Sequence, residues 1–274
     1  MGGKQGMTTL AARTARGASK VRYEKHPVYR SDELVRMVTE EIMRAGTTVF
    51  QLFQFGGGER AHSLRLLDLA FLPPGAKVLS LGSGVGGMEK YWHDVRKDLE
   101  FELVNLSGEQ LKLLLCPGRK VQADAEGYVS DRRPFDCVIL AYMLGHVAVR
   151  KTLESAFENL RPGGTLLITD VFDSQPLFDS EMLYTSPQIL DVLKFIEEKG
   201  VCCRSFFRLG MPSAYAAKHI SPGVLVMTSP AVFFIERNRD AKQNCEAGQD
   251  DGRGSAQSSV CEEGRDTSVR CEGV

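Results

Sequence analysis

The sequence predicts an α/β fold, in which a doubly wound and mostly parallel β-sheet carries helices on both faces. Short, continuous apolar runs alternate with longer stretches of helical periodicity through the middle of the chain, as expected for strands that are buried on both faces. A glycine-rich turn at residues 82–87 directly follows the first of these runs. Because ligands in such sheets bind beyond the carboxyl ends of the strands, this turn also marks the expected binding edge.

Six apolar runs are expected to form strands: residues 77–81, 101–104, 135–140, 164–169, 204–209 and 231–236. Helical periodicity covers residues 32–45, 62–71, 88–96, 150–160 and 186–199. In the last of these, Ser186 and Pro187 are expected at the N-cap and first helical positions, and Gly200 is expected to end the helix. Strands and helices that alternate in this order favour a parallel sheet.

Composition divides the chain into three parts. Residues 1–30 contain seven basic residues and one acid, and we expect a disordered basic arm, with a transit peptide or a nucleic-acid arm as alternatives. Residues 239–274 are rich in Gly, Ser, Gln, Asp and Glu, which predicts a disordered polar tail. The folded domain should therefore span residues 31–238, with residues 31–76 as an N-terminal helical cap.

Overall composition limits the function classes. The 274 residues are 43% hydrophobic and carry a formal net charge of −1, so no overall field favours nucleic acid or an anionic membrane. No run approaches the roughly 20 apolar residues of a membrane span, and no signal-peptide core is expected. Seven cysteines without a C-x-x-C pair favour a reducing compartment. We expect the cytoplasm, with organelle targeting by the basic N-terminus as the alternative.

The glycine-rich turn permits two kinds of ligand. Gly82 and Gly84 would let a ligand lie against the backbone, and Gly86 would permit close packing of the following helix. The same segment satisfies G-x-G-x-x-G through Gly82, Gly84 and Gly87, so a dinucleotide remains possible on the turn alone. The residues that follow must decide between the two.

Four downstream motifs follow the turn in order. Residues 105–111 read Asn-Leu-Ser-Gly-Glu-Gln-Leu, and residues 121–126 read Val-Gln-Ala-Asp-Ala-Glu. Phe-Asp-Cys-Val-Ile-Leu follows at residues 135–140, and Leu-Arg-Pro-Gly-Gly at residues 160–164. Together with the turn, this series resembles the motifs of class I S-adenosylmethionine (SAM) methyltransferases, especially their small-molecule branch. The resemblance implies a Rossmann-like sheet of seven strands with an antiparallel last strand.

The resemblance also implies a cofactor site for SAM and no metal. Asn105 and Gln110 would hold the ribose, while Asp124 and the backbone of Ala125 would meet the adenine. Phe55 and Gly56 belong to a segment that resembles one lying over the methionine end of SAM in some members. The full set of expected cofactor contacts is Phe55, Gly56, Gly82, Ser83, Gly84, Gly86, Asn105, Leu106, Gln110, Asp124, Ala125 and Ala141.

The expected reaction is in-line transfer of the methyl group to a small, partly apolar molecule. His146 is the candidate general base and Tyr142 a second catalytic candidate, since both follow the fourth strand at the mouth of the site. The alternative for His146 is a cap on the next helix. No N-P-P-[YF] motif or Pro-Cys pair follows that strand, which disfavours nucleic acid as the acceptor. A protein or RNA methyltransferase that uses the basic arm, and a non-catalytic SAM-binding protein, are the alternative functions.

Overall fold

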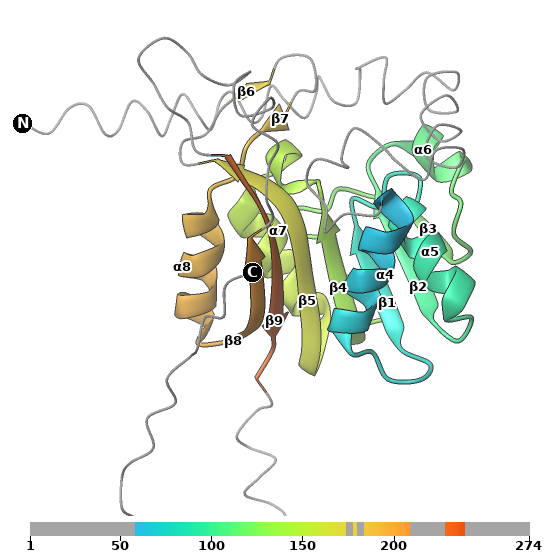
Figure 1. The fold of residues 1–274 in the computed structure, drawn as a ribbon. Coiled ribbons are helices and arrows are strands. Elements are labelled where there is room, and N and C mark those ends of the chain that lie inside the picture. The colour runs from blue at the N-terminus through green and yellow to red at the C-terminus, as the bar shows by residue number, and fades with distance from the viewer. Residues whose placement is uncertain (1–57, 174–177, 180–183, 209–227, 239–274) are drawn as a thin grey trace, which may run out of the picture. The chain divides into compact units, whose positions relative to one another are not determined.

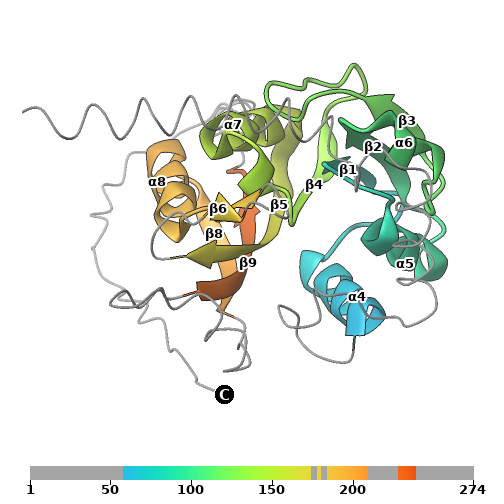
Figure 2. The ribbon, with the colours of Figure 1, turned by 90° about the horizontal axis from the view of Figure 1, so that it is seen from above.

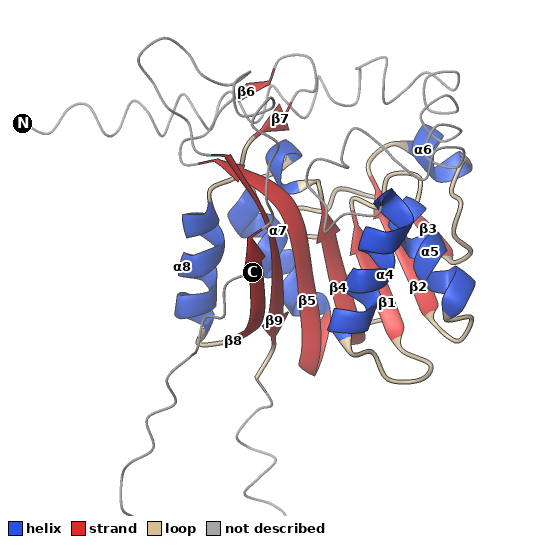
Figure 3. Cartoon of the chain, viewed as in Figure 1, coloured by secondary structure: helices blue, strands red, loops and turns tan. Residues whose placement is uncertain are grey.

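The computed structural model describes residues 58–173, 178–179, 184–208 and 228–238. Their main feature is a seven-stranded sheet in the order β3-β2-β1-β4-β5-β9-β8, shown as arrows in Figure 1 and in red in Figure 3. The strands are β1 (Lys77–Leu81), β2 (Glu100–Asn105), β3 (Arg119–Gln122), β4 (Phe135–Ala141), β5 (Leu160–Asp173), β8 (Cys202–Arg208) and β9 (Thr228–Glu236). A separate two-stranded pair joins β6 (Phe178–Asp179) to β7 (Tyr184–Thr185).

The first five strands are parallel, and β9 runs antiparallel to both of its neighbours, β5 and β8. The order reverses at β1, because β2 lies on one side of β1 and β4 on the other. This confirms the predicted doubly wound, mostly parallel sheet with an antiparallel last strand. Ligands of such sheets bind at the point where the strand order reverses. The glycine-rich turn begins at this point, at the end of β1.

Helices cover both faces of the sheet, as predicted (Figure 2). On one face, α4 (Gly58–Ala70) and α5 (Gly87–Val95) bury Leu66, Met88 and Trp92 against the sheet. On the other, α7 (Val149–Asn159) and α8 (Ile189–Lys199) bury Leu153 and Phe195. Successive residues of the central strands alternate between the two cores. Both faces of these strands are therefore apolar, which explains their continuous apolar runs.

Several predicted boundaries differ from the structure. The strand expected at residues 164–169 begins at Leu160 and ends at Asp173, because Leu160 already pairs with Phe135 before a shift in register. α8 has Gln188 as its N-cap, so the predicted start at Ser186 is wrong. Gly200 does end this helix, in the left-handed conformation with φ of 59°. A glycine adopts this conformation without the steric cost that a Cβ imposes.

Other predictions fall outside the described residues. These are the helix at residues 32–45, the contacts of Phe55 and Gly56, and the disorder of the two tails. The limits of the predicted domain accordingly remain predictions. Among the helices that are described, none is long and apolar enough to cross a membrane.

Candidate cofactor and acceptor site

The glycine-rich turn between β1 and α5 has a well-defined backbone. Gly82, Gly84 and Gly86 have φ angles of 74°, 57° and 70°, which lie in the left-handed region that favours glycine. The amides of Gly82 and Ser83 both donate to the carbonyl oxygen of Val104, at 2.8 and 3.0 Å. Gly86 is the N-cap of α5. The turn is therefore fixed to the end of β2, and the first amides of α5, which have no acceptor within the helix, begin directly behind it.

The three glycines differ in the space around them. A Cβ at Gly82 would lie 3.0 Å from Cβ of Met143, and one at Gly86 would lie 2.8 Å from Cδ2 of Leu114. A Cβ at Gly84 would meet no atom within 4 Å. The predicted close approach of a ligand to the backbone is thus sterically open at Gly84, whereas Met143 already packs against Gly82.

Two features of the turn fit a polar cofactor. The hydroxyl oxygen of Ser83 is buried and has no hydrogen-bond partner within the described residues, and a buried unsatisfied hydroxyl is uncommon in a folded protein. Gly84, the next residue in the chain, has open space where a Cβ would lie. Both features match what the amino acid end of SAM would need, a hydrogen-bonding group beside an open backbone.

Asn105, at the end of β2, ties the turn to the next segment. Its Nδ2 donates to the carbonyl oxygen of Gly84 at 3.3 Å and to Oε1 of Gln110 at 2.5 Å, while its Oδ1 accepts from the amide of Leu106 at 3.0 Å. Ser107 caps the short helix α6 (Gly108–Lys112) and accepts from the amide of Gln110. Asn105 is 3% exposed. Its hydrogen bonds hold both the turn and the Gln110 side chain in place.

Asp124 and Ala125 lie in the turn that follows β3. The amide of Ala123 donates to the carbonyl oxygen of Asn105 at 3.1 Å, which places this turn beside the end of β2. Oδ1 of Asp124 accepts from the amide of Glu126 at 3.0 Å, and Ala125 is buried. One carboxylate oxygen of Asp124 thus shapes its own turn. Contact of this half-buried side chain with adenine stays a prediction.

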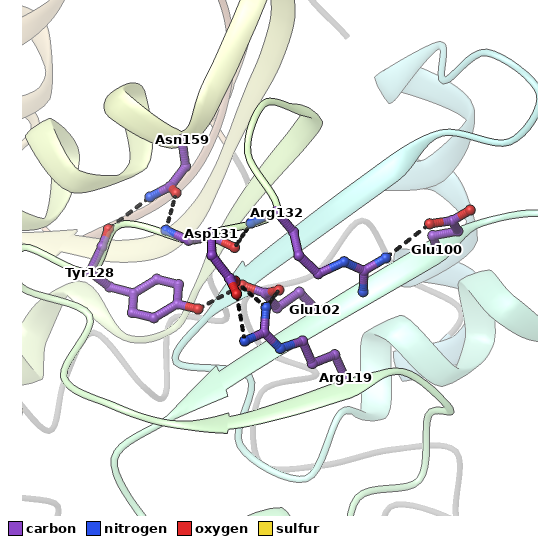
Figure 4. A network of polar contacts seen from close by, with 8 residues as sticks. Glu100, Glu102, Arg119, Tyr128, Asp131, Arg132 and Asn159 are labelled. Atoms are coloured by element: carbon purple, nitrogen blue, oxygen red, sulfur yellow. Dashed lines mark hydrogen bonds and ion pairs between the residues drawn. The ribbon is translucent and has the colours of Figure 1, made fainter.

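A polar network anchors the segment that carries this turn (Figure 4). Glu102 of β2 is fully buried and accepts from Arg119 at 3.1 Å and from the hydroxyl of Tyr128 at 2.7 Å. Arg119 also pairs with Asp131, and Asn159 donates to the carbonyl oxygen of Tyr128 at 2.8 Å. Burial, followed by the hydrogen bond to Glu102, raises the pKa of Tyr128 to about 12. The buried carboxylate of Glu102 thus has the hydrogen-bond partners that a buried polar group needs. Its contact with Tyr128 and the Arg119–Asp131 pair hold residues 123–131 against the sheet.

The segment after β4 forms the expected mouth of the site. Ala141 is half-buried at the strand end, and Tyr142 has a φ of 52°, which is uncommon for a residue with a Cβ. The amide of Tyr142 donates to the carbonyl oxygen of Thr169 at 2.8 Å. Asp170 accepts from the amide of Leu144 at 2.9 Å. Contacts from β5 therefore fix the path of this segment beside Gly82.

His146 ends a short 3-10 helix, η2 (Leu144–His146), and is half-buried. Its amide donates to the carbonyl oxygen of Met143 at 3.0 Å. The N-cap of α7 is Ala148 rather than His146, and the amide of Ala148 donates to Glu126 at 2.6 Å. His146 therefore does not occupy the N-cap position itself, and both its structural role before α7 and its role as a base stay predictions.

The structure adds a residue that the sequence analysis missed. His62 of α4 is 1% exposed, and its Nε2 lies 3.3 Å from the hydroxyl oxygen of Tyr142. Burial lowers the pKa of His62 to about 4. A signal was available, because His62 begins an i, i+4, i+8 series with the buried Leu66 and Ala70. A polar residue on such an apolar stripe must find a partner in the core.

Comparison with known proteins identifies the family. Residues 58–202, more than half of the chain, match the family described as methyltransferase domain. The chain belongs to this family. It is a SAM-dependent methyltransferase. In its seven-stranded sheet, the glycine-rich turn follows β1, as predicted.

Two curated relatives share the name ubiquinone/menaquinone biosynthesis C-methyltransferase UbiE. The Vibrio cholerae protein is 25% identical over 185 residues, which cover 63% of this methyltransferase and 70% of the relative. The Vibrio vulnificus protein is 30% identical over 135 residues, which cover 45% and 51% of the two chains. These matches support the family on the level of sequence.

Solved structures confirm the fold. The geranyl diphosphate C-methyltransferase from Streptomyces coelicolor, in complex with Mg²⁺, geranyl diphosphate and S-adenosyl-L-homocysteine, has a TM-score of 0.55 at 13% identity. The match covers 65% of this methyltransferase and 79% of that chain. Phosphoethanolamine N-methyltransferase 2 from Haemonchus contortus has a TM-score of 0.57 at 15% identity and covers 80% and 59%.

Proposed function

We propose that this methyltransferase transfers the methyl group of SAM by in-line displacement to a small, partly apolar acceptor beyond the carboxyl end of β4. The observation that supports this proposal most directly is the composition of the segment at the end of β4. The aromatic ring of Tyr142 is followed by the buried side chains of Met143 and Leu144, and Met143 packs against Gly82 of the cofactor turn. A segment this apolar beside the cofactor turn suits a small acceptor that has an apolar body and few polar groups.

The relatives support this class of acceptor. The names of the Vibrio proteins place them in ubiquinone and menaquinone biosynthesis as C-methyltransferases. The Streptomyces enzyme is a C-methyltransferase crystallised with geranyl diphosphate. Ubiquinone, menaquinone and geranyl diphosphate share a small polar head and an apolar prenyl part, and we infer an acceptor of comparable character for this chain.

The proposed roles follow from the contacts of each residue. Ser83 and Gly84 would hold the amino acid end of SAM, Gln110 the ribose, and Asp124 with Ala125 the adenine. When bound, SAM supplies a methyl group activated by its sulfonium centre. Tyr142 would then align the acceptor and, with Met143, exclude water from it. His146 would take up a proton where the acceptor must lose one.

Two arginines of the sheet give little support for a nucleic-acid acceptor. Arg133, which precedes β4, pairs with Glu158 at 2.5 Å. Arg161, near the start of β5, pairs with Asp136 at 2.6 Å. Both arginines belong to the amino ends of these strands, away from the proposed acceptor position, and their carboxylate partners compete with any phosphate.

Methyl transfer from tritiated SAM to defined pools would test the proposal. One pool contains prenylated phenols and hydroquinones, and the others contain total RNA and total protein. We expect label in the organic extract of the first pool, unchanged by deletion of residues 1–25. Label in RNA or protein that is lost with this deletion and falls steeply with salt would instead support a docking arm and a macromolecular acceptor.

We also propose that the protein works in the cytoplasm. Cys116, Cys137, Cys202 and Cys203 are free thiols in the structure, which is usual in a reducing compartment. Fluorescence microscopy of the full chain tagged at its C-terminus would test this location. A signal confined to an organelle would favour targeting by the basic N-terminus.

A further inference from the structure

The side chain of Asn105 is held by two backbone groups of opposite character. Its Nδ2 donates to the carbonyl oxygen of Gly84 at 3.3 Å, and its Oδ1 accepts from the amide of Leu106 at 3.0 Å. A carbonyl oxygen can only accept a hydrogen bond, and a backbone N–H can only donate one. An exchange of the two ends of the Asn105 amide would therefore break both contacts. This buried side chain accordingly has one favoured orientation.

The orientation of Asn105 determines how Gln110 faces it. Nδ2 of Asn105 lies 2.5 Å from the side-chain oxygen Oε1 of Gln110. Because Nδ2 is a donor, Gln110 must turn its oxygen toward Asn105 and its Nε2 away from it. Both hydrogens of Nδ2 are then in use, one on Gly84 and one on Gln110. Asn105 therefore has no hydrogen left for a ligand, whereas Nε2 of Gln110 donates to no atom of the described residues.

The Gln110 amide lies beside the glycine-rich turn. The same Nδ2 atom of Asn105 contacts both Gly84 and Gln110, and Gly84 has open space where a Cβ would lie. Gln110 is half-buried in α6, which begins shortly after the end of β2. These contacts place the amide at the carboxyl edge of β2. In related nucleotide-binding sheets, the side chain at this strand end meets the ribose.

We propose that Asn105 is a positioning residue, which holds the Gln110 amide so that Nε2 donates to a ribose hydroxyl oxygen of the cofactor. The inference rests on the proposed function and adds the direction of this hydrogen bond. In dinucleotide folds, an acidic side chain at this strand end accepts hydrogen from a ribose hydroxyl. Here the ribose oxygen is the acceptor instead. The site should therefore tolerate a ribose that has no hydrogen to donate at this position.

Fluorinated analogues of the demethylated cofactor test this direction. In two analogues of S-adenosylhomocysteine, fluorine replaces either the 2′ or the 3′ hydroxyl with little change in size. Fluorine cannot donate a hydrogen bond, but it can face an N–H donor without repulsion. The fluorine ratio is the dissociation constant of an analogue divided by that of S-adenosylhomocysteine, both measured by calorimetry on the full chain. Because the ratio compares two ligands within one protein, a general loss of cofactor affinity cancels from it.

Two variants should reverse the hydrogen bond. Gln110→Glu replaces Nε2 by a carboxylate oxygen, which can only accept. Asn105→Asp removes the donor that faces Gln110, so the Gln110 amide should turn and present Oε1 to the ribose. In both variants the hydroxyl ligand can donate and the fluorinated one cannot. For at least one analogue, we expect the fluorine ratio to rise about tenfold in Gln110→Glu and about threefold in Asn105→Asp, the usual effects of a charged and a neutral hydrogen bond.

A matched control separates this effect from added charge. Gln122 is exposed at the end of β3, and Gln122→Glu adds the same charge as Gln110→Glu. It should keep the wild-type fluorine ratio. An unchanged ratio in Gln110→Glu would show that Gln110 does not face a ribose hydroxyl. An unchanged ratio in Asn105→Asp, or an equal rise in Gln122→Glu, would show that Asn105 does not set the direction. Each of these results overturns the inference.

A measurement on the wild-type chain decides the question if Asn105→Asp does not fold. Hydrogen exchange of the side-chain amides is followed by NMR, with the Gln110 signals assigned by their loss in Gln110→Glu. The Nδ2 hydrogens of Asn105 should exchange slowly without ligand, because both are engaged. Those of Gln110 should slow only when S-adenosylhomocysteine binds. Fast exchange of the Asn105 hydrogens, or no slowing at Gln110, would overturn the inference.

The cofactor affinity separates the two levels of the proposal. A wild-type chain that does not bind S-adenosylhomocysteine would contradict the proposed function itself. A wild-type chain that binds it, with none of the expected changes in the fluorine ratio, would contradict only the roles given to Asn105 and Gln110.

Discussion

Substitution of Gly84 by alanine offers a direct test of where the cofactor lies. The new Cβ would meet no protein atom within 4 Å, and φ at this residue is 57°. The folded protein therefore has room for the methyl group and loses stability only through the strained backbone. For a residue with a Cβ in this conformation the cost is about 1–2 kcal/mol, or roughly 2–8 °C in Tm for a domain of this size.

A cofactor lying against Gly84 would meet the added methyl group. We expect the affinity for S-adenosylhomocysteine to fall at least about tenfold, which corresponds to roughly 1.4 kcal/mol. Gly75→Ala is the matched control. The φ of Gly75 is 69°, and a Cβ there would also meet nothing within 4 Å. Gly75 precedes β1 and so lies at the opposite end of the strands from Gly84. This variant should lose similar stability and keep the affinity.

The assay combines thermal unfolding without ligand and isothermal titration calorimetry with S-adenosylhomocysteine. Equal losses of Tm with a loss of affinity only in Gly84→Ala would support the placement. Unchanged affinity in Gly84→Ala would refute it, since the open space at this glycine would then lie outside the cofactor site.

Three further predictions concern side chains of the site. Asp124→Ala should weaken binding of S-adenosylhomocysteine by roughly 1–3 kcal/mol, the cost of a lost charged hydrogen bond, while calorimetry on Asp68→Ala, an exposed acid on α4, should show no change. His146→Ala should lower the turnover of tritiated SAM with little effect on cofactor affinity, and full activity would exclude this residue as the base. The pKa of His62 is lowered from 6.5 to about 4, so the unfolded chain takes up this proton at a higher pH than the folded one. Stability should therefore fall by roughly 3 kcal/mol as the pH drops from 6.5 to 4, and His62→Gln should flatten this part of the pH profile in urea unfolding.

The central strands could be predicted because burial on both faces requires continuous apolar sequences. β1 and β4 are covered by helices on both faces, and their continuous apolar residues gave nearly the observed bounds. β3 shows the opposite case. It is an edge strand whose residues Arg119–Gln122 are mostly exposed, so no apolar run marks it. Its place follows from pairing with β2, a tertiary contact that local pattern does not contain.

The site shows the same limit. The motifs located the turns at Gly82, Asn105 and Asp124, because each needs a particular residue type at a strand end. The roles within them depend on partners distant in the sequence. The ribose contact of Asn105 stays a prediction, and the structure adds that its amide holds Gly84 and Gln110. The apolar stripe of α4 marks His62 as a buried polar residue, but its partner Tyr142 lies 80 residues away and cannot be inferred from that pattern.

The contact between Gly82 and Met143 has a consequence for how this enzyme can change. The glycine-rich turn and the segment after β4 touch there, with Met143 filling the place that a Cβ at residue 82 would need. A larger side chain at 82 would push on the residue next to Tyr142, and a reshaped residue 143 would disturb the turn. Laboratory evolution toward a new acceptor should therefore meet epistasis, in which a substitution at one of the two positions becomes acceptable only after a matching change at the other.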